Sequence, residues 1–507
     1  MEASSTKSET ISLTTTIAEP CGEPSTKEVL RNKAFMFLFA AQFSQNIGAA
    51  VSWLALQFFI FSMTGSPGLM GLLSIIYWLP YVLITPFAGV LVDRFDQRKI
   101  MLVSNILSFI ASLGYVLVYL LREKLIIHTI TTIFFSNGGK TIIHQFNTIH
   151  IIWLLFVFVF FNQTAAAFFF PSRNAYTRLV VQKKNLLIAN SIGTTVFQVA
   201  TIVGYVLAGL LASINYLASF IFDSSTFAFS ISMIILIMLF GQKPPSPERE
   251  KAPNIKKEIE SVKDDLIIGY RTIRKTPKVS YMLILFASAI FSFAAFNVLF
   301  IVILQGEMGL NSTWYGALQA VMGTSGIVTA LILMNIGQLD RKILILNISI
   351  SSLTVILYFY SFIRNKWAMI GILFILGIGL VCINIPATTL IQELIPYEKQ
   401  GRVFGTQQLI QGIARLLGMG LVSLIAEIVL PMYIILASSV FMTIVVVWGF
   451  FYSSKRGLMK SDYCKLEEED KELEKAKPPS EKSQDKSLSI NQQEEIIQSD
   501  GSSSYSE

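Results

Sequence analysis

Twelve apolar stretches recur along this chain of 507 residues, and they set the first limit on its fold. A helix rises ~1.5 Å per residue, so each stretch can cross the ~30 Å apolar core of a bilayer. Because hydrocarbon offers no hydrogen-bond partner to free backbone groups, such stretches must be helical. They predict an all-α membrane protein with twelve transmembrane helices. The stretches are 34–61, 68–92, 100–121, 151–172, 187–211, 216–241, 279–305, 313–335, 343–363, 367–395, 403–427 and 431–453.

The composition agrees with this class. Only 14% of the residues are charged and 53% are hydrophobic, whereas roughly a quarter of a soluble domain is charged. In a membrane protein the net charge of +7 is explained by basic cytoplasmic loops, so we expect no nucleic-acid partner. Cys21, Cys382 and Cys464 are too dispersed for a disulfide or metal framework, and we expect no cofactor.

The loops indicate how the chain is oriented. An even number of spans places both termini on one side, where basic residues gather, for example in 94–99 and 183–184. The positive-inside rule therefore predicts cytoplasmic termini in the plasma membrane. Residues 1–33 lack an apolar core of the kind found in signal peptides, so we expect the first span to direct insertion. The opposite side holds Arg122, Lys124, Lys140, Arg364 and Lys366.

A polar segment, 242–278, divides the spans six and six. Apolar residues at intervals of three and four from Ile255 to Ile273 predict an amphipathic helix that tethers two bundles at the membrane interface. Pro171 and Pro386 each end a span before a basic loop, which indicates two related six-helix repeats. The predicted organisation is a tail 1–33, a bundle 34–241, the linker 242–278, a bundle 279–453 and a disordered tail 454–507.

Charge is concentrated in the loop "GVLVDRFDQRK", residues 89–99. The loop resembles the motif of the major facilitator superfamily, Gly-x-Leu-x-Asp-Arg/Lys-x-Gly-Arg/Lys-Arg/Lys, although Asp96 replaces the usual Gly. Together with "TGSPGLMGLLS", "FFFPSRNA" and "LIPYEKQGRVFG" it is similar to bacterial exporters of the macrolide-efflux and enterobactin-export group. The resemblance covers about 30 to 455 and implies two pseudo-symmetric bundles. The residues that fit the motif are Gly89, Leu91, Asp93, Arg94, Arg98 and Lys99.

This loop has two interpretations. Any membrane protein can carry such charges as an orientation anchor. The resemblance implies instead a conformational latch, in which Asp93 faces the start of the eleventh span at Gly401 and Arg402, a positive helix-dipole end. The acidic residue that the family places on the fourth span is absent here. Asp96 offers a local replacement that would pair with Arg98 or Arg178.

Two isolated charges fall inside spans, Asp223 in the sixth and Arg415 in the eleventh. Ionisable groups at this depth are costly and are functional candidates. Burial favours the neutral form of a carboxylate, so Asp223 is a candidate proton carrier, with Arg415 as a second coupling candidate. The structural alternative is that Asp223 fixes the sixth span against the fifth. Thr201 stands where related exporters have a fifth-span Arg.

Polar residues near the middle of four spans are candidates for substrate contact. The resemblance implies that spans one, four, seven and ten line a central cavity. Ordinary interhelical hydrogen bonds are the alternative role for these amides. A cavity without acidic residues favours neutral or zwitterionic lipophiles. The candidates are Gln42, Asn46, Asn162, Gln163, Asn297 and Asn384.

No catalytic constellation, phosphate loop or metal-ligand spacing is present, so we do not expect an enzyme. His128, His144 and His150 lie in the external connection between spans three and four, 122–150, where we expect plain surface residues. We expect a monomeric, proton-coupled exporter of a lipophilic or amphipathic small molecule (a drug, macrolide-like compound or siderophore) working by alternating access in the lipid bilayer. The alternatives are a lysophospholipid or metabolite carrier and a non-transporting receptor or scaffold.

Overall fold

The computed structural model of the protein describes residues 25–125, 149–241, 255–336 and 341–458. Within these ranges every regular element is a helix, and twelve helices are long and apolar enough to cross a membrane, which confirms the predicted fold class. The first group is α1 (Thr26–Arg31), α2 (Lys33–Thr64), α3 (Pro67–Arg94), α4 (Gln97–Leu125), α5 (Ile149–Val180), α6 (Leu186–Ile214) and α7 (Tyr216–Phe240). The second is α8 (Ile255–Lys275), α9 (Pro277–Ile301) with a π-helical turn (Val302–Glu307), α10 (Ser312–Ile336), α11 (Lys342–Phe362), α12 (Lys366–Leu394), α13 (Tyr397–Ile425) and α14 (Pro431–Lys455).

The chain reverses direction between spans in short, capped turns. Between α2 and α3, Gly65 ends the helix in the left-handed region (φ 61°), which only glycine adopts without strain. Ser66 then caps α3 by accepting a hydrogen bond from the N–H of Leu69 (3.1 Å), and Pro67 occupies the first turn. The sequence "TGSP" therefore dictates both the end of one span and the start of the next.

The two prolines predicted to end spans do not do so. Pro171 lies inside α5 and Pro386 inside α12, and each helix continues to its end at Val180 or Leu394. In lipid, a proline removes one hydrogen bond, whereas ending the helix would expose several backbone groups to hydrocarbon. The predicted end of the fourth span at 172 was wrong for this reason, whereas the predicted tenth span, 367–395, already contains Pro386 and agrees with α12.

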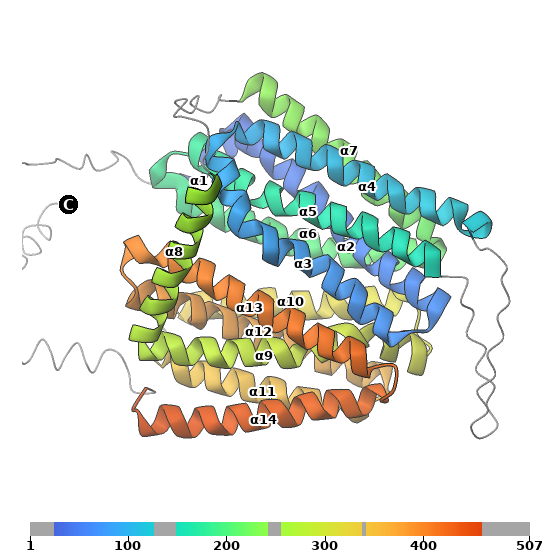
Figure 1. Ribbon diagram of the computed structural model, residues 1–507, viewed down its shortest axis with the longest axis vertical. Helices are drawn as coiled ribbons and strands as arrows, with labels where there is room; N and C mark the ends of the chain where they lie inside the picture. Colours follow the sequence, from blue (N-terminus) through green and yellow to red (C-terminus); the bar gives the residue numbers. More distant parts are fainter. Residues whose placement is uncertain (1–24, 126–148, 242–254, 337–340, 459–507) are drawn as a thin grey trace, which may run out of the picture.

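The helices form two groups that repeat one packing scheme. We call α2–α7 the N-half and α9–α14 the C-half; they lie in the upper and lower parts of Figure 1. In the N-half α2 packs on α6 and α7, α5 on α3 and α4, and α4 on α7. In the C-half α9 packs on α13 and α14, α12 on α10 and α11, and α11 on α14. Each C-half contact is the N-half contact displaced by six spans, as expected of two structural repeats.

The halves meet through two equivalent contacts, α6 with α10 and α3 with α13. In the first, a Cβ at Gly316 would lie 2.4 Å from the carbonyl oxygen of Tyr205, and one at Gly209 would lie 2.9 Å from that of Ser312. In the second, a Cβ at Gly71 would lie 2.8 Å from Cα of Ser423. Small residues of this kind let membrane helices approach to backbone contact.

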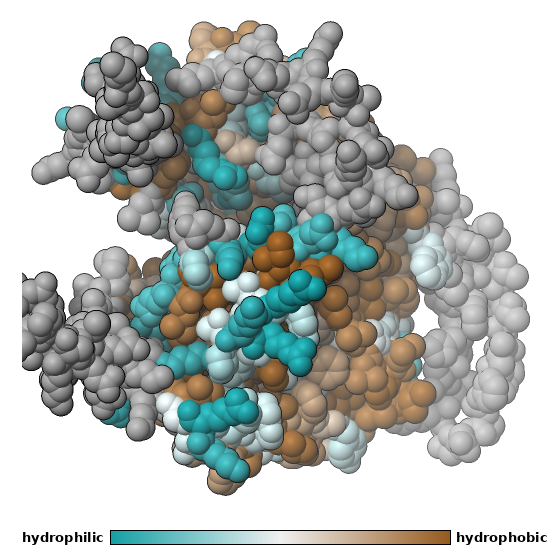
Figure 2. Space-filling model, turned by 60° about the vertical axis from the view of Figure 1, so that its left-hand side comes forward, coloured by the Kyte–Doolittle hydropathy of each residue, from teal (hydrophilic) through white to brown (hydrophobic). Residues whose placement is uncertain are grey.

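Both described chain ends lie at one end of the helix bundle, where α1 begins and α14 ends; we call this the terminal end (Figure 1). The end of α4 and the start of α5 lie at the opposite, distal end. The linker forms α8, which crosses the terminal end and packs on α13, with further contacts to α9 and α3. Figure 2 shows hydrophilic side chains gathered on this part of the surface, with hydrophobic side chains exposed along the helices beyond it.

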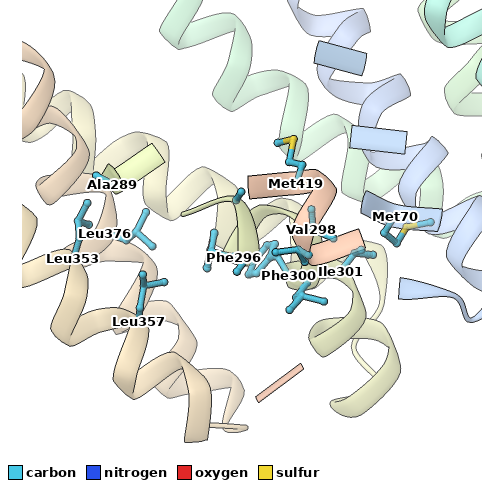
Figure 3. Packing of buried hydrophobic residues seen from close by; sticks show 14 of the residues in the cluster. Met70, Ala289, Phe296, Val298, Phe300, Ile301, Leu353, Leu357, Leu376 and Met419 are labelled. Atoms are coloured by element: carbon cyan, nitrogen blue, oxygen red, sulfur yellow. The ribbon is translucent and has the colours of Figure 1, made fainter. Parts of the chain in front are cut away.

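One apolar core continues across the contact between the halves. Figure 3 shows Met70 of α3 near Met419 of α13, with Phe296, Phe300 and Ile301 of α9 beyond them. The same cluster of buried residues extends to α11 and α12. The halves are therefore joined by close packing as well as by the linker.

We predict that Gly316→Ala destabilises this conformation, because its Cβ would meet a backbone carbonyl of α6 that cannot move independently. Overpacking costs about 1–3 kcal/mol. Gly371→Ala is the matched control, since a Cβ there meets nothing within 4 Å. Thermal unfolding in detergent should show a midpoint several degrees lower for Gly316→Ala, and equal midpoints for the two variants would contradict the prediction.

Candidate functional site

The charged loop between α3 and α4 contains an ion pair in which Arg98 contacts both carboxylate oxygens of Asp96. Nη2 of Arg98 lies 2.8 Å from Oδ2 of Asp96, and Nε lies 3.1 Å from Oδ1. The N–H of Arg98 also donates to Oδ1 (3.0 Å), and Arg98 is only 6% exposed. Burial raises the pKa of Asp96, but the hydrogen bonds from Arg98 outweigh it and hold that pKa below its ordinary value. Of the two partners that the sequence allowed Asp96, the structure forms the pair with Arg98.

The proposed latch contact stays a prediction. The backbone of Gly89, Asp93 and Arg94 is the last part of α3, but their side chains lie outside the described residues. At the start of α13, where the latch partner of Asp93 was expected, Nε of Arg402 pairs with Oδ1 of Asp265 in α8 (2.7 Å). Arg402 is therefore already paired with α8. A Cβ at Gly401 would meet nothing within 4 Å. Leu91 and Lys99 are exposed beside a groove between α4 and α5.

A cavity of about 390 Å³ lies within the N-half, between α2, α3, α4, α5 and α6. Aromatic side chains make up much of its wall: the rings of Trp53 and Tyr77 are 4.3 Å apart, and Trp78 and Tyr81 continue the same wall along α3. No charged residue is among the described residues that line this cavity. Its walls therefore suit an apolar or aromatic molecule.

Four of the six amides predicted to contact substrate line this cavity, namely Gln42, Asn46, Asn162 and Gln163. The Asn162 side chain donates to the Ser108 carbonyl at 3.5 Å, which is a weak hydrogen bond. Nδ2 of Asn46 is buried and has no hydrogen-bond partner within the described structure. Such a donor is available to an acceptor on a bound molecule.

The other two predicted amides lie elsewhere. Asn297 and Asn384 are exposed, and each donates to a carbonyl of its own helix, at 3.1 Å to Phe293 and 2.8 Å to Leu380. Neither lines the cavities described in this section. They are placed on spans seven and ten as the resemblance implied, but they do not join the N-half amides in one pocket.

Two further cavities adjoin the first. One, of about 440 Å³, shares Gln42, Phe170 and Phe197 with it and continues toward the terminal end past Arg173. The other, of about 410 Å³, shares Trp78 and Tyr81 with it. It lies between α3 and α13, and Leu266 of α8 forms part of its wall. The three cavities are therefore neighbours along one path (the cavity path).

The halves are joined at the distal end. Tyr315 of α10 donates to Oε1 of Gln57 in α2 (3.0 Å), and the N–H of Gly68 donates to Glu427, which follows α13 (3.0 Å). Near the terminal end of α13, by contrast, a Cβ at Gly401 or Gly405 would meet no described atom within 4 Å. In the part of the chain that the structure describes, these hydrogen bonds close the halves together at the distal end, and the cavity lined by Arg173 lies toward the terminal end.

Asp223 is completely buried, between α7 and α2. Its Oδ1 lies 2.8 Å from the position that a Cβ of Gly48 would take. Neither carboxylate oxygen accepts a well-aligned hydrogen bond in the described structure, because the Ser52 hydroxyl, which lies beside the carboxylate, donates to the Ala49 carbonyl instead (3.4 Å). Gly48 and Ser52, which neighbour the carboxylate, belong to span one, and the structural alternative, in which Asp223 fixes span six against span five, stays a hypothesis.

Arg415 lies on α13 with its guanidinium 4.0 Å from the centre of the Trp78 ring, a cation–π contact between the halves. It lines the cavity between α3 and α13. Within the described residues no carboxylate pairs with it. The three histidines lie outside the described side chains, and so does the tail from 459 onward.

Sequence reasoning missed the aromatic wall and Arg173. Tyr77, Trp78 and Tyr81 recur at one- and four-residue spacing, which places Tyr77 and Tyr81 on one helix face. In a chain with 38 Phe this signal is hidden by aromatic residues that face lipid. Arg173 follows the predicted end of the fourth span at 172, so the sequence did not single it out; the longer α5 places it on the cavity path.

The ion pair in the loop should make stability depend on pH. Because the pKa of Asp96 is lowered in the folded protein, its contribution is present above the unfolded value of about 3.9 and is lost as pH falls through the folded value. Asp96→Asn should lower the unfolding midpoint at pH 7, and the difference from wild type should shrink toward pH 3. Asp264→Asn, at an exposed carboxylate of α8, is the control. A difference that is equal at both pH values would refute this role.

Comparison with known proteins agrees with this geometry. The family description "Major Facilitator Superfamily" matches residues 38–419. The chain is 24% identical over 397 residues to macrolide efflux protein A of Streptococcus pyogenes (78% of this chain, 89% of the relative). It is 25% identical over 416 residues to the uncharacterized MFS-type transporter YfiS of Bacillus subtilis (79% and 89%).

Among solved structures, a bacterial homologue of the iron transporter ferroportin, in an inward-facing state, superimposes with a TM-score of 0.62 at 15% identity. The match covers 82% of this chain and 98% of that one. At this identity the likeness concerns the fold alone. Together with twelve spans arranged as two repeats, the family match leads to one conclusion: the chain is a multi-pass membrane transporter that belongs to the Major Facilitator Superfamily.

Proposed function

We propose that this transporter exports a lipophilic or amphipathic small molecule from the cell by alternating access, with both termini in the cytoplasm of the plasma membrane. The observation that carries the proposal is the aromatic, amide-bearing cavity of about 390 Å³ in the N-half. A mostly apolar pocket with a few polar groups suits a ligand that is itself mostly apolar. The similarity to macrolide efflux protein A supports efflux as the direction.

The conformation is consistent with loading from the cytoplasm. With cytoplasmic termini, the closed distal end would face outward and the cavities would lie on the inner side. Opening to the outside would then require separation of the glycine contacts of α6 with α10 and α3 with α13. Such contacts are made in one state and lost in the other, as alternating access requires.

We further propose that proton antiport drives the cycle, with Asp223 as the proton carrier. Its carboxylate is buried without a hydrogen-bond partner in the described structure. An ionised carboxylate in such a place is costly, so the neutral acid is favoured in this conformation. If α2 moved relative to α7 and water or a hydrogen-bond donor reached the carboxylate, the ionised form would be stabilised. Asp223 would then release its proton.

One observation favours a second function, a lysophospholipid carrier. A large apolar groove between α4 and α5 has Lys99 and Asp96 at one end, which would suit an acyl chain with a charged headgroup. Ser104 lines both this groove and the N-half cavity. Export of a lysophospholipid but of no other lipophile would select this alternative.

The proposed function predicts transport by everted membrane vesicles that contain the protein. An imposed pH gradient, acid inside, should drive uptake of lipophilic fluorescent drugs, and collapse of the gradient should abolish it. The same vesicles without the protein are the control. Deletion of 457–507 should leave the flux unchanged, since an exporter does not need the tail. Absence of gradient-dependent flux for any drug, siderophore or lysophospholipid would argue against the proposal, and dependence on the tail would favour a scaffold.

Asp223→Asn should abolish the effect of the pH gradient while it preserves membrane insertion. The reason is that an amide has the shape of a carboxylic acid but neither binds nor releases a proton in this pH range. Counterflow of substrate, which needs no proton driving force, should persist. Asp264→Asn on the exposed face of α8 should behave as wild type. If the variant retains full gradient-driven flux, Asp223 is not the carrier.

A further inference from the structure

Among the described residues, the cavity path contains two arginines and no acidic residue. Arg173 lines the cavity toward the terminal end, and Arg415 lines the one between α3 and α13. The described lining of the three cavities includes no Asp or Glu. Both arginines are half-buried in a largely apolar lining, and charges withdrawn from water are ordinarily paired.

Arg415 has a stacking partner but no ionic partner. Its guanidinium lies over the Trp78 ring at 4.0 Å. None of the ion pairs in the described structure includes it. A guanidinium stacked through its face keeps its N–H groups, which lie in the plane, free for a carboxylate or phosphate.

Arg173 is arranged in the same way on the opposite half. Its guanidinium lies over the Phe170 ring at 4.5 Å, and its N–H groups donate to Oδ1 of Asn174 (2.6 and 3.2 Å). This acceptor is neutral, so the charge of Arg173 is not balanced. Tyr81 lines two of the three cavities, including the one that Arg415 lines. The two cations therefore flank one aromatic wall.

Polar atoms without partners accompany Arg415. Nε2 of Gln411 and Oγ1 of Thr85 line the same cavity, are buried, and have no hydrogen-bond partner in the described structure. Gln411 adds a neutral amide donor and Thr85 a hydroxyl to the guanidinium. Donors of this kind around a cation, with an aromatic surface beside them, complement an acidic group attached to an apolar body.

We infer that the cavity path binds a small amphipathic anion, with its carboxylate or phosphate beside Arg415 and its apolar part against Trp78 and Tyr81. Arg173 supplies the second cation on the side of the terminal end. This inference rests on the proposed function for the direction of transport, and it narrows the substrate class from lipophiles in general to amphipathic acids. An acidic lipid headgroup and a soluble amphipathic acid share this chemistry.

The test measures binding rather than flux. The full chain is placed in phosphatidylcholine nanodiscs, and equilibrium dialysis gives the affinity for naphthoate, naphthalenemethanol and naphthylmethylammonium. These probes share one aromatic body and differ in charge. Naphthoate should bind at least about tenfold more tightly than the neutral and cationic probes. The same measurement in nanodiscs with phosphatidylglycerol identifies the source: unchanged naphthoate binding assigns the site to soluble acids, whereas competition assigns it to a lipid headgroup.

The variants test the residues. Arg415→Gln should reduce the preference for naphthoate over naphthalenemethanol to near unity, and Arg415→Lys should retain part of it. Arg456→Gln is the matched control, since this arginine also stacks on an aromatic ring, Tyr452 at 5.0 Å, but lines none of the three cavities. Equal affinities for the three probes in the wild type, or an anion preference that survives Arg415→Gln, would overturn the inference. Anion-selective binding without gradient-driven flux would instead overturn the proposed exporter alone.

Discussion

Backbone-to-backbone contact between the halves is the constraint on which the rest of the molecule depends. The halves touch through α6 with α10 and α3 with α13, and both contacts require residues without side chains at the crossing. Ile202 packs against Gly323 in the first contact and Val82 against Gly412 in the second, so glycine also leaves room for larger side chains of the facing helix. Gly405 and Gly412 line the cavity between α3 and α13, which therefore adjoins the second contact.

Much of the fold could be predicted from sequence because lipid permits few solutions. An apolar stretch of sufficient length has to be a helix, and this single rule placed all twelve spans. The same rule explains the error at Pro171, where the fourth span was predicted to end at 172 although α5 continues to Val180. The amphipathic period around Leu266 likewise predicted the helix α8, since its apolar face needed a partner.

The site was less predictable, because it depends on which way each helix faces. Gln42 and Asn46 share a face by spacing and do line one cavity, whereas Asn297 and Asn384 have no local signal that distinguishes a cavity face from an exposed one. The depth of Asp223 could be read from its position in the span, but its neighbour Gly48 lies far away in sequence. The stacking of Arg415 on Trp78 joins the two halves, and no pattern within either half encodes it.

The charge balance of the cavity path has a consequence for energetics. A carrier that exposes its site alternately to the two sides moves the charges of Arg173 and Arg415 relative to the electric field of the membrane. Each elementary charge that crosses the full field is worth about 2.3 kcal/mol per 100 mV. An anionic cargo would cancel part of this charge, so the empty and loaded carriers would respond differently to voltage. The membrane potential would then favour one direction of the conformational change by which the carrier returns without cargo. No additional coupling ion would be needed for this effect.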